Sequence, residues 1–138
     1  MQTDFTPSEE IIPQKKSTHE LGVEGEDKAV SYLLSNGYSV VERNFRTREG
    51  EVDIIALGKT RKENDTLVFF EVKSLAHGSL ENLSYLVNRI KQEKIIKTAK
   101  CYLKKYRQYS DRYIRFDVLA IDAPGENPVH HIVNAFSE

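Results

Sequence analysis

Apolar residues recur along the chain with two different periods. Spacings of three and four residues predict helices over residues 17–36 and 85–109. Shorter apolar runs, bounded by glycine, proline, asparagine and aspartate, predict strands. These runs cover residues 38–45, 51–57, 67–74, 113–122 and 130–136.

The two predicted helices carry recognisable signals. Ser17-Thr18-His19-Glu20 has the spacing of a capping box, in which each side chain satisfies the other residue's backbone amide. Gly37 suits the left-handed conformation that ends many helices. The second helix has an apolar stripe that should face the rest of the protein. Its members are Ile95, Ala99, Tyr102, Leu103 and Tyr106.

The order of these elements indicates the fold class. The polar stretch from Gly58 to Thr66 has turn signals, so residues 51–57 and 67–74 should form a hairpin. The second of these strands is apolar almost throughout, which is typical of a central strand covered on both faces. The order helix, three strands, helix, two strands predicts an α/β fold with a central mixed β-sheet flanked by helices.

Length and composition fit one domain. A chain of 138 residues that is 39% hydrophobic can bury one ordinary core. We expect residues 17–138 to form this domain, and residues 1–16, with two prolines among polar residues, to be loosely ordered. Cys101 is the single cysteine, which suits a reducing cytoplasm. No apolar run reaches membrane-spanning length and residues 1–16 lack an export signal, so we expect a cytoplasmic protein with no membrane partner.

Three charged residues stand out in the apolar strands. Side chains alternate across a strand, so Glu71 and Lys73 should project from the same face. Asp53 lies between Val52 and Ile54, where burying a carboxylate is costly without a compensating partner. Carboxylates on two neighbouring strands supply the oxygen ligands that magnesium prefers, and a nearby ammonium can orient water or stabilise a phosphate. This combination suits phosphodiester hydrolysis, with Asp53 and Glu71 as ligands of Mg²⁺ or Mn²⁺.

The spacing of Asp53, Glu71 and Lys73 resembles the split Asp…Glu-x-Lys signature of the PD-(D/E)xK nucleases. Further short motifs accompany it over residues 21–136. They are Gly25-Glu26, Tyr32-Leu33, Gly37-Tyr38, Asn44-Phe45-Arg46, Gly50-Glu51-Val52-Asp53, Phe70-Glu71-Val72-Lys73 and Ala135-Phe136. Together they resemble the bacterial YraN-like family, which is related in fold to Holliday-junction resolvases.

The resemblance implies a restriction-endonuclease-like PD-(D/E)xK fold and a metal-dependent endonuclease that acts on DNA, with branched structures among its candidate substrates. It implies that Glu26, on a partly buried helix face, completes a catalytic set with Asp53, Glu71 and Lys73. Asp117 also matches a family position, but we expect it to form a structural pair with a nearby base. Related resolvases act as dimers, so a homodimer is one candidate assembly.

The second predicted helix is strongly basic, although a net charge of -1 excludes a globally basic surface. Lys97, Lys100, Lys104 and Arg107 fall on one stripe opposite the apolar face. We expect them to bind nucleic acid, and a merely solvated basic face is the alternative. Lys91 falls only about 40° from the centre of the apolar stripe, so it should point toward the sheet. The family often has a lysine at this place, which makes Lys91 a candidate phosphate contact.

Other functions stay open at this stage. Glu71 and Lys73 alone could form a surface ion pair of little consequence. The family commonly has an arginine two places after Lys73, where this chain reads Ser74-Leu75, so a phosphate contact is missing. The chain could be a non-catalytic nucleic-acid-binding or assembly module with a degenerate nuclease site. It could also be a protein-interaction domain that uses a sheet edge or a helix surface.

Overall fold

Five strands form one sheet in the computed structural model of the chain, which describes residues 18–75, 87–123, 125 and 127–138. The strands are β1 (Ser39–Thr47), β2 (Gly50–Gly58), β3 (Thr66–Ser74), β4 (Tyr113–Ile121) and β5 (His130–Phe136). They lie in that order across the sheet, and neighbouring strands are antiparallel except β3 and β4, which are parallel. The predicted mixed sheet with a central third strand is confirmed.

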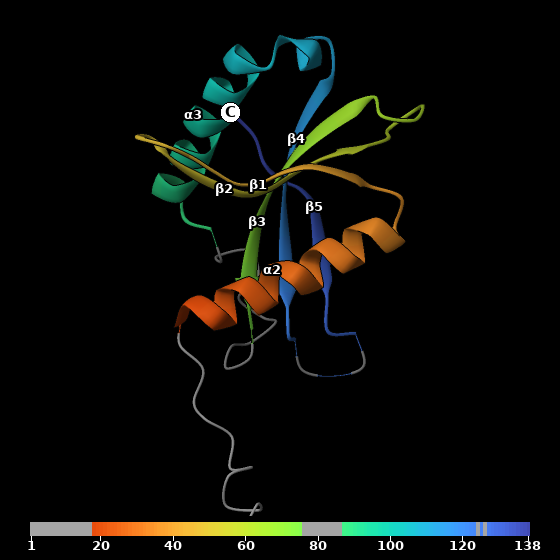
Figure 1. The fold of residues 1–138 in the computed structure, drawn as a ribbon, viewed down its shortest axis with the longest axis vertical. Coiled ribbons are helices and arrows are strands. Elements are labelled where there is room, and N and C mark those ends of the chain that lie inside the picture. Colours follow the sequence, from red (N-terminus) through yellow and green to blue (C-terminus); the bar gives the residue numbers. More distant parts are fainter. Residues whose placement is uncertain (1–17, 76–86, 124, 126) are drawn as a thin grey trace, which may run out of the picture.

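Two helices cover opposite faces of this sheet (Figure 1). The helix α2 (Thr18–Ser35) packs Ala29 and Leu33 on one face. The helix α3 (Arg89–Lys105) connects β3 to β4 and packs Ile95, Ala99 and Tyr102 on the other, as its apolar stripe predicted. Neither helix is long and apolar enough, over the residues described, to cross a membrane. The result is the expected α/β domain, consistent with a restriction-endonuclease-like fold.

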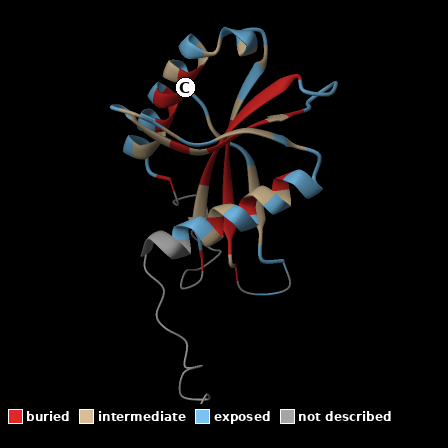
Figure 2. Cartoon of the chain, in the orientation of Figure 1, coloured by how far each residue is buried: buried red, intermediate tan, exposed pale blue. Residues whose placement is uncertain are grey.

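The apolar run of β3 explains its central place. Leu67 and Phe69 belong to the core under α3, whereas Val68 and Phe70 belong to the core under α2. All four side chains are fully buried. Figure 2 shows the buried positions gathered along the middle strands and the inward sides of the helices. A strand that is covered on both faces therefore needs apolar residues at successive positions.

The helix ends agree with the sequence at one point and correct it at another. Gly37 has a φ of 84°, the left-handed conformation expected after α2. The helix α3 is shorter than predicted: it begins at Arg89 because the side chain of Asn88 accepts a hydrogen bond from the Lys91 N–H at 2.9 Å. A separate 3₁₀ turn, η2 (Arg107–Tyr109), follows it. The predicted loosely ordered segment 1–16, Ser17 of the capping box and residues 85 and 86 lie outside the described residues.

Candidate functional site

Asp53 and Glu71 come together across the β2–β3 hairpin. Ile54 is paired with Phe70 in the antiparallel register. This pairing places Asp53, the residue before Ile54, beside Glu71, the residue after Phe70. The backbone N–H of Val72 donates a hydrogen bond to Oδ2 of Asp53 at 2.8 Å. The backbone of the neighbouring strand β3 therefore holds the Asp53 carboxyl group in place.

The surroundings of Asp53 raise its pKa to about 8. Burial is the largest cause, and the negative charge of Glu71 is the second. The hydrogen bond from the N–H of Val72 lowers the pKa, but by less than burial and Glu71 raise it. Two carboxyl groups this close cannot both ionise without a large cost unless a cation compensates them. The pair therefore favours a bound proton or a bound cation.

Glu71 is only 3% exposed and contacts two ammonium groups. Its Oε2 lies 3.4 Å from Nζ of Lys73 and 3.2 Å from Nζ of Lys91. Lys73 reaches it from the same face of β3, as side-chain alternation predicted, and Lys91 reaches it from the first turn of α3. Because Glu71 is buried, the pair with Lys73 is not an exposed surface ion pair of the kind that contributes little.

Glu26 lies on a partly buried face of α2, as predicted, with 15% of its side chain exposed. Its Oε1 accepts hydrogen bonds from Nδ2 of Asn44 at 2.9 Å and from Arg43 at 3.4 Å. No three or more Asp, Glu, His or Cys side chains within the described ranges are grouped to hold a metal ion. Glu26 therefore does not form such a group with Asp53 and Glu71, and its catalytic role stays a prediction.

Asp53 and Glu71 on their own fit a magnesium site. Mg²⁺ is usually bound by one or two carboxylates, and water and substrate phosphate oxygens fill its remaining positions. Two adjacent carboxyl groups, one of them with a raised pKa, meet this requirement without a third protein ligand. They are the residues that could hold Mg²⁺ or Mn²⁺.

The predicted stripe of lysines lies on the outer side of α3. Lys97, Lys100 and Lys104 are all exposed. Lys100 forms an ion pair with Glu138, the last residue of the sequence. This exposure is compatible with phosphate contacts and equally with a solvated face, so the nucleic-acid role of these lysines stays a prediction.

A hollow of about 500 Å³ lies beside the acidic pair, between the β1–β2 turn and α3. Arg46 and Lys94 line it together with Lys91. Neither was predicted as a site residue, although Arg46 belongs to the motif Asn44-Phe45-Arg46. A usable signal was present at the hairpin tip, where Arg46 and Arg48 lie within four residues before Gly50. For Lys94, which lines the hollow from α3, the neighbouring residues in the sequence gave no comparable signal.

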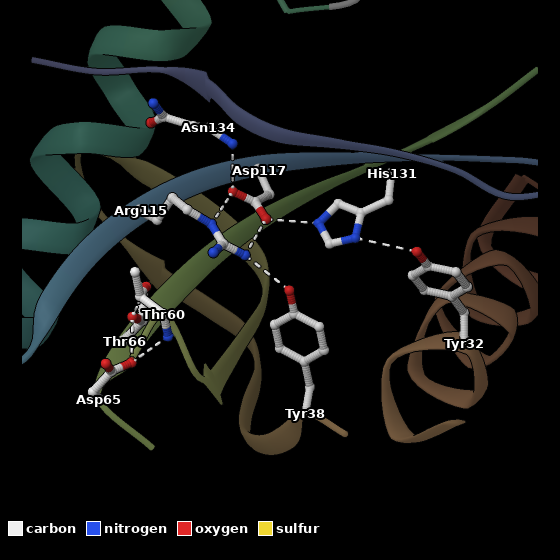
Figure 3. Close-up of polar contacts among 9 residues, drawn as sticks. All are labelled: Tyr32, Tyr38, Thr60, Asp65, Thr66, Arg115, Asp117, His131 and Asn134. Carbon is white, nitrogen blue, oxygen red and sulfur yellow. Dashed lines mark hydrogen bonds and ion pairs between the residues drawn. The ribbon is translucent and has the colours of Figure 1, made fainter. Parts of the chain in front are cut away.

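A second buried cluster lies on the α2 face of the sheet (Figure 3). The fully buried Asp117 carboxylate is bonded to Arg115 at 2.8 and 2.9 Å, to Nε2 of His131 at 2.6 Å and to the N–H of Asn134 at 2.9 Å. Burial alone would raise the pKa of Asp117, but these hydrogen bonds outweigh burial and lower it. Two hydroxyls extend the cluster, those of Tyr32 and Tyr38. The predicted structural pairing of Asp117 is confirmed.

Comparison with known proteins gives the chain's family. Residues 25–121 match the model described as "Uncharacterised protein family UPF0102". A UPF0102 protein of Treponema denticola is 43% identical over 124 residues, which cover 86% of this chain and 95% of that protein. UPF0102 proteins of Persephonella marina (44% over 115 residues, 83% and 91% covered) and Geobacter metallireducens (43% over 117 residues, 84% and 91% covered) are similar. The chain therefore belongs to the UPF0102 family, the YraN-like family that its motifs resemble.

Proposed function

We propose that this protein is a magnesium- or manganese-dependent nuclease that hydrolyses phosphodiester bonds of DNA, with branched DNA among its substrates. The observation that carries the proposal is the pairing of Asp53 and Glu71, two neighbouring carboxyl groups on adjacent strands. The ammonium of Lys73 lies 3.4 Å from Glu71. The resemblance of these three residues to the PD-(D/E)xK signature supports the same chemistry.

Asp53 and Glu71 would hold the metal ion. When bound, such an ion supplies Lewis-acid activation of the phosphodiester and of a water molecule. The N–H of Val72 contributes by fixing the orientation of the Asp53 carboxyl group toward this position. A carboxylate that is held by the neighbouring strand loses little conformational freedom on binding a ligand.

Lys73 is the residue that can act on the reacting groups from the protein side. Its side chain is 34% exposed, so the ammonium can reach a substrate while its stem lies beside Glu71. An ammonium has three donors, which can orient an attacking water or stabilise charge on the phosphate oxygens. Lys91 compensates the buried charge of Glu71 from the other side.

A second candidate function is nucleic-acid binding or assembly without cleavage. It is favoured by the ion pairs of Glu71 with both Lys73 and Lys91, which balance this carboxylate within the protein. The residue two places after Lys73 is Leu75, a buried apolar side chain in place of the family's arginine. On this hypothesis the acids are retained for folding.

A cleavage assay separates the two functions. Labelled single-stranded, duplex and four-way-junction DNA would be incubated with the protein and Mg²⁺, Mn²⁺ or a chelator. Asp53→Asn and Glu71→Gln serve as near-isosteric variants, and Asp111→Asn, at a position whose side chain is 79% exposed, serves as the matched control.

We expect cleavage that needs a divalent ion, is lost in both site variants and is retained in the control. Cleavage that survives in chelator or in Asp53→Asn would exclude the proposed site. Binding without cleavage for every DNA and both ions, with the variants folded by circular dichroism, would favour the second function.

A further inference from the structure

The hollow beside the acidic pair is formed by two elements that are far apart in the sequence. Arg46, Thr47 and Glu51 line it from the β1–β2 hairpin, and Lys91 and Lys94 line it from the first two turns of α3. The hairpin turn lies directly against the helix. A Cβ added at Gly50 would lie 3.2 Å from Cβ of Lys94 and 3.3 Å from Oγ1 of Thr98. Glycine at this position therefore permits the close approach that shapes the hollow.

The charges of the hollow are unbalanced in favour of cations. It contains three basic side chains and one carboxylate, and Nε of Arg46 already donates to Oε2 of Glu51 at 2.6 Å. Lys94 is exposed, and its ammonium has no ion-pair or hydrogen-bond partner among the residues that the structure describes. A surface hollow with unpaired positive charge suits an anion.

Lys91 joins this hollow to the proposed catalytic site. Its side chain lines the hollow, and its ammonium lies 3.2 Å from Oε2 of Glu71. An anionic group in the hollow would therefore lie one lysine away from the acidic pair. A single long anion could occupy both the hollow and the position beside the acidic pair. Two separate small anions at these positions would repel each other.

The lysines of α3 favour a polymer over a small anion. Residues three or four apart on a helix are neighbours, with Cβ atoms about 5–6 Å apart. Lysines at this spacing begin with Lys91 beside Glu71 and continue around the helix to its exposed side. The successive members are Lys91, Lys94, Lys97, Lys100 and Lys104. This row of charges matches the repeated phosphates of a nucleic-acid strand better than one isolated phosphate.

We propose that the hollow between the β1–β2 turn and α3 binds a backbone phosphate of a nucleic-acid strand, next to the phosphodiester that lies at Asp53 and Glu71. Lys94 and Arg46 are the residues that make this contact. The placement beside a scissile bond rests on the proposed nuclease function, but binding in the hollow does not require cleavage.

Binding in chelator tests the hollow separately from the chemistry. Fluorescence anisotropy would follow fluorescein-labelled single-stranded and duplex oligonucleotides over a series of salt concentrations. The test variants are Lys94→Gln and Arg46→Gln. The matched controls are Lys62→Gln and Arg61→Gln, at exposed positions in the β2–β3 turn, at the opposite end of β2.

We expect each hollow variant to weaken binding and to reduce the slope of log affinity against log salt by about 0.7–0.9, the value for one lost phosphate contact. The control variants should keep the wild-type slope. Equal effects in hollow and control variants would overturn the assignment, because they would indicate non-specific attraction. Displacement of the oligonucleotide by micromolar inorganic phosphate would also overturn it, because it would indicate a site for free phosphate.

The two proposals fail in different ways. Weaker binding in Lys94→Gln and Arg46→Gln, with no cleavage by the wild type under any condition, would support the hollow and contradict the nuclease function. Cleavage that depends on Asp53, together with hollow variants that bind like their controls, would support the nuclease function and contradict the hollow.

Discussion

The ammonium of Lys91, on the first turn of α3, lies 3.2 Å from Oε2 of Glu71 on β3. This contact ties the helix to the central strand at the point where Glu71 meets Asp53. Glu71 is 3% exposed, whereas the Lys91 side chain is 39% exposed. The lysine thus links a buried carboxylate to the surface, and the ammonium groups beside Glu71 come from α3 as well as from the sheet.

The two lysines on Glu71 should contribute more together than separately. Lys73→Met or Lys91→Met leaves one ammonium on the buried carboxylate, and we expect each to lower the free energy of unfolding by about 1 kcal/mol. The double variant leaves Glu71 without either ammonium, so its loss should exceed the sum of the single losses. Urea denaturation measures all three, and Lys97→Met is the exposed control. Strictly additive losses would contradict this, because they would mean that the two lysines act independently of each other.

Adding Glu71→Gln to that double variant should restore part of the stability, because the neutral side chain no longer needs a cation. The same urea titrations measure this triple variant. A triple variant that is no more stable than the double variant would show that packing of the lysine stems, rather than charge, is responsible.

Asp53 should make the protein less stable as the pH rises. Its pKa in the folded protein is about 8 and its ordinary value is near 4, so between these values only the unfolded chain loses the proton. The free energy of unfolding therefore falls from about pH 4 to pH 8. Asp53→Asn removes this contribution, and we expect the variant to gain at least about 1 kcal/mol relative to wild type between pH 5 and pH 8. Urea titrations at pH 5 and pH 8 measure this gain, with Asp111→Asn as control. If the free energy of unfolding changes equally with pH in wild type and Asp53→Asn, the raised pKa is contradicted.

Metal binding should depend on Asp53 and Glu71 more than on Glu26. A ligand that binds only the folded state stabilises it by about 2.7 kcal/mol at a hundred times its Kd. We expect Mg²⁺ or Mn²⁺ to raise the Tm of wild type and of Glu26→Gln, because Glu26 is bonded to Arg43 and Asn44. The ions should not raise the Tm of Asp53→Asn. Thermal unfolding at constant ionic strength measures the shifts, and loss of the shift in Glu26→Gln would make Glu26 a third ligand.

The residues of the site differ in how far the sequence could predict them. Glu71 and Lys73 share a face of one strand, so alternation alone placed them together. The direction of Lys91 followed from its angle to the apolar stripe of α3. The partners of Glu26 could not be predicted, because they depend on how α2 lies across β1. Lys94 was missed for a similar reason: its place in the hollow depends on the approach of Gly50 to the helix.

The fold was more predictable than the site, because its main signals are local. The run from Leu67 to Phe70 indicated a strand covered on both faces, and Gly37 indicated the end of α2. The start of α3 was placed too early because Val87 continues the apolar pattern up to the cap. The helix begins after Asn88 because the side-chain oxygen of Asn88 caps it. The spacing of apolar residues does not reveal such a cap.

Asp117 should matter for stability and not for metal binding. Its buried carboxylate accepts hydrogen bonds from Arg115, His131 and the N–H of Asn134, so Asp117→Asn leaves the partly buried Arg115 without its counter-ion. We expect a loss of about 3–5 kcal/mol in the free energy of unfolding at neutral pH. Because the folded pKa of Asp117 is lowered, its stabilisation is present above its ordinary pKa and is lost as the pH falls through the folded value. Urea denaturation at pH 7 and pH 3, on either side of the ordinary pKa of 3.8, should therefore show a smaller difference between wild type and variant at the lower pH. A variant as stable as wild type at pH 7, or one that loses the metal-induced rise in Tm while folded, would contradict a purely structural role for this cluster.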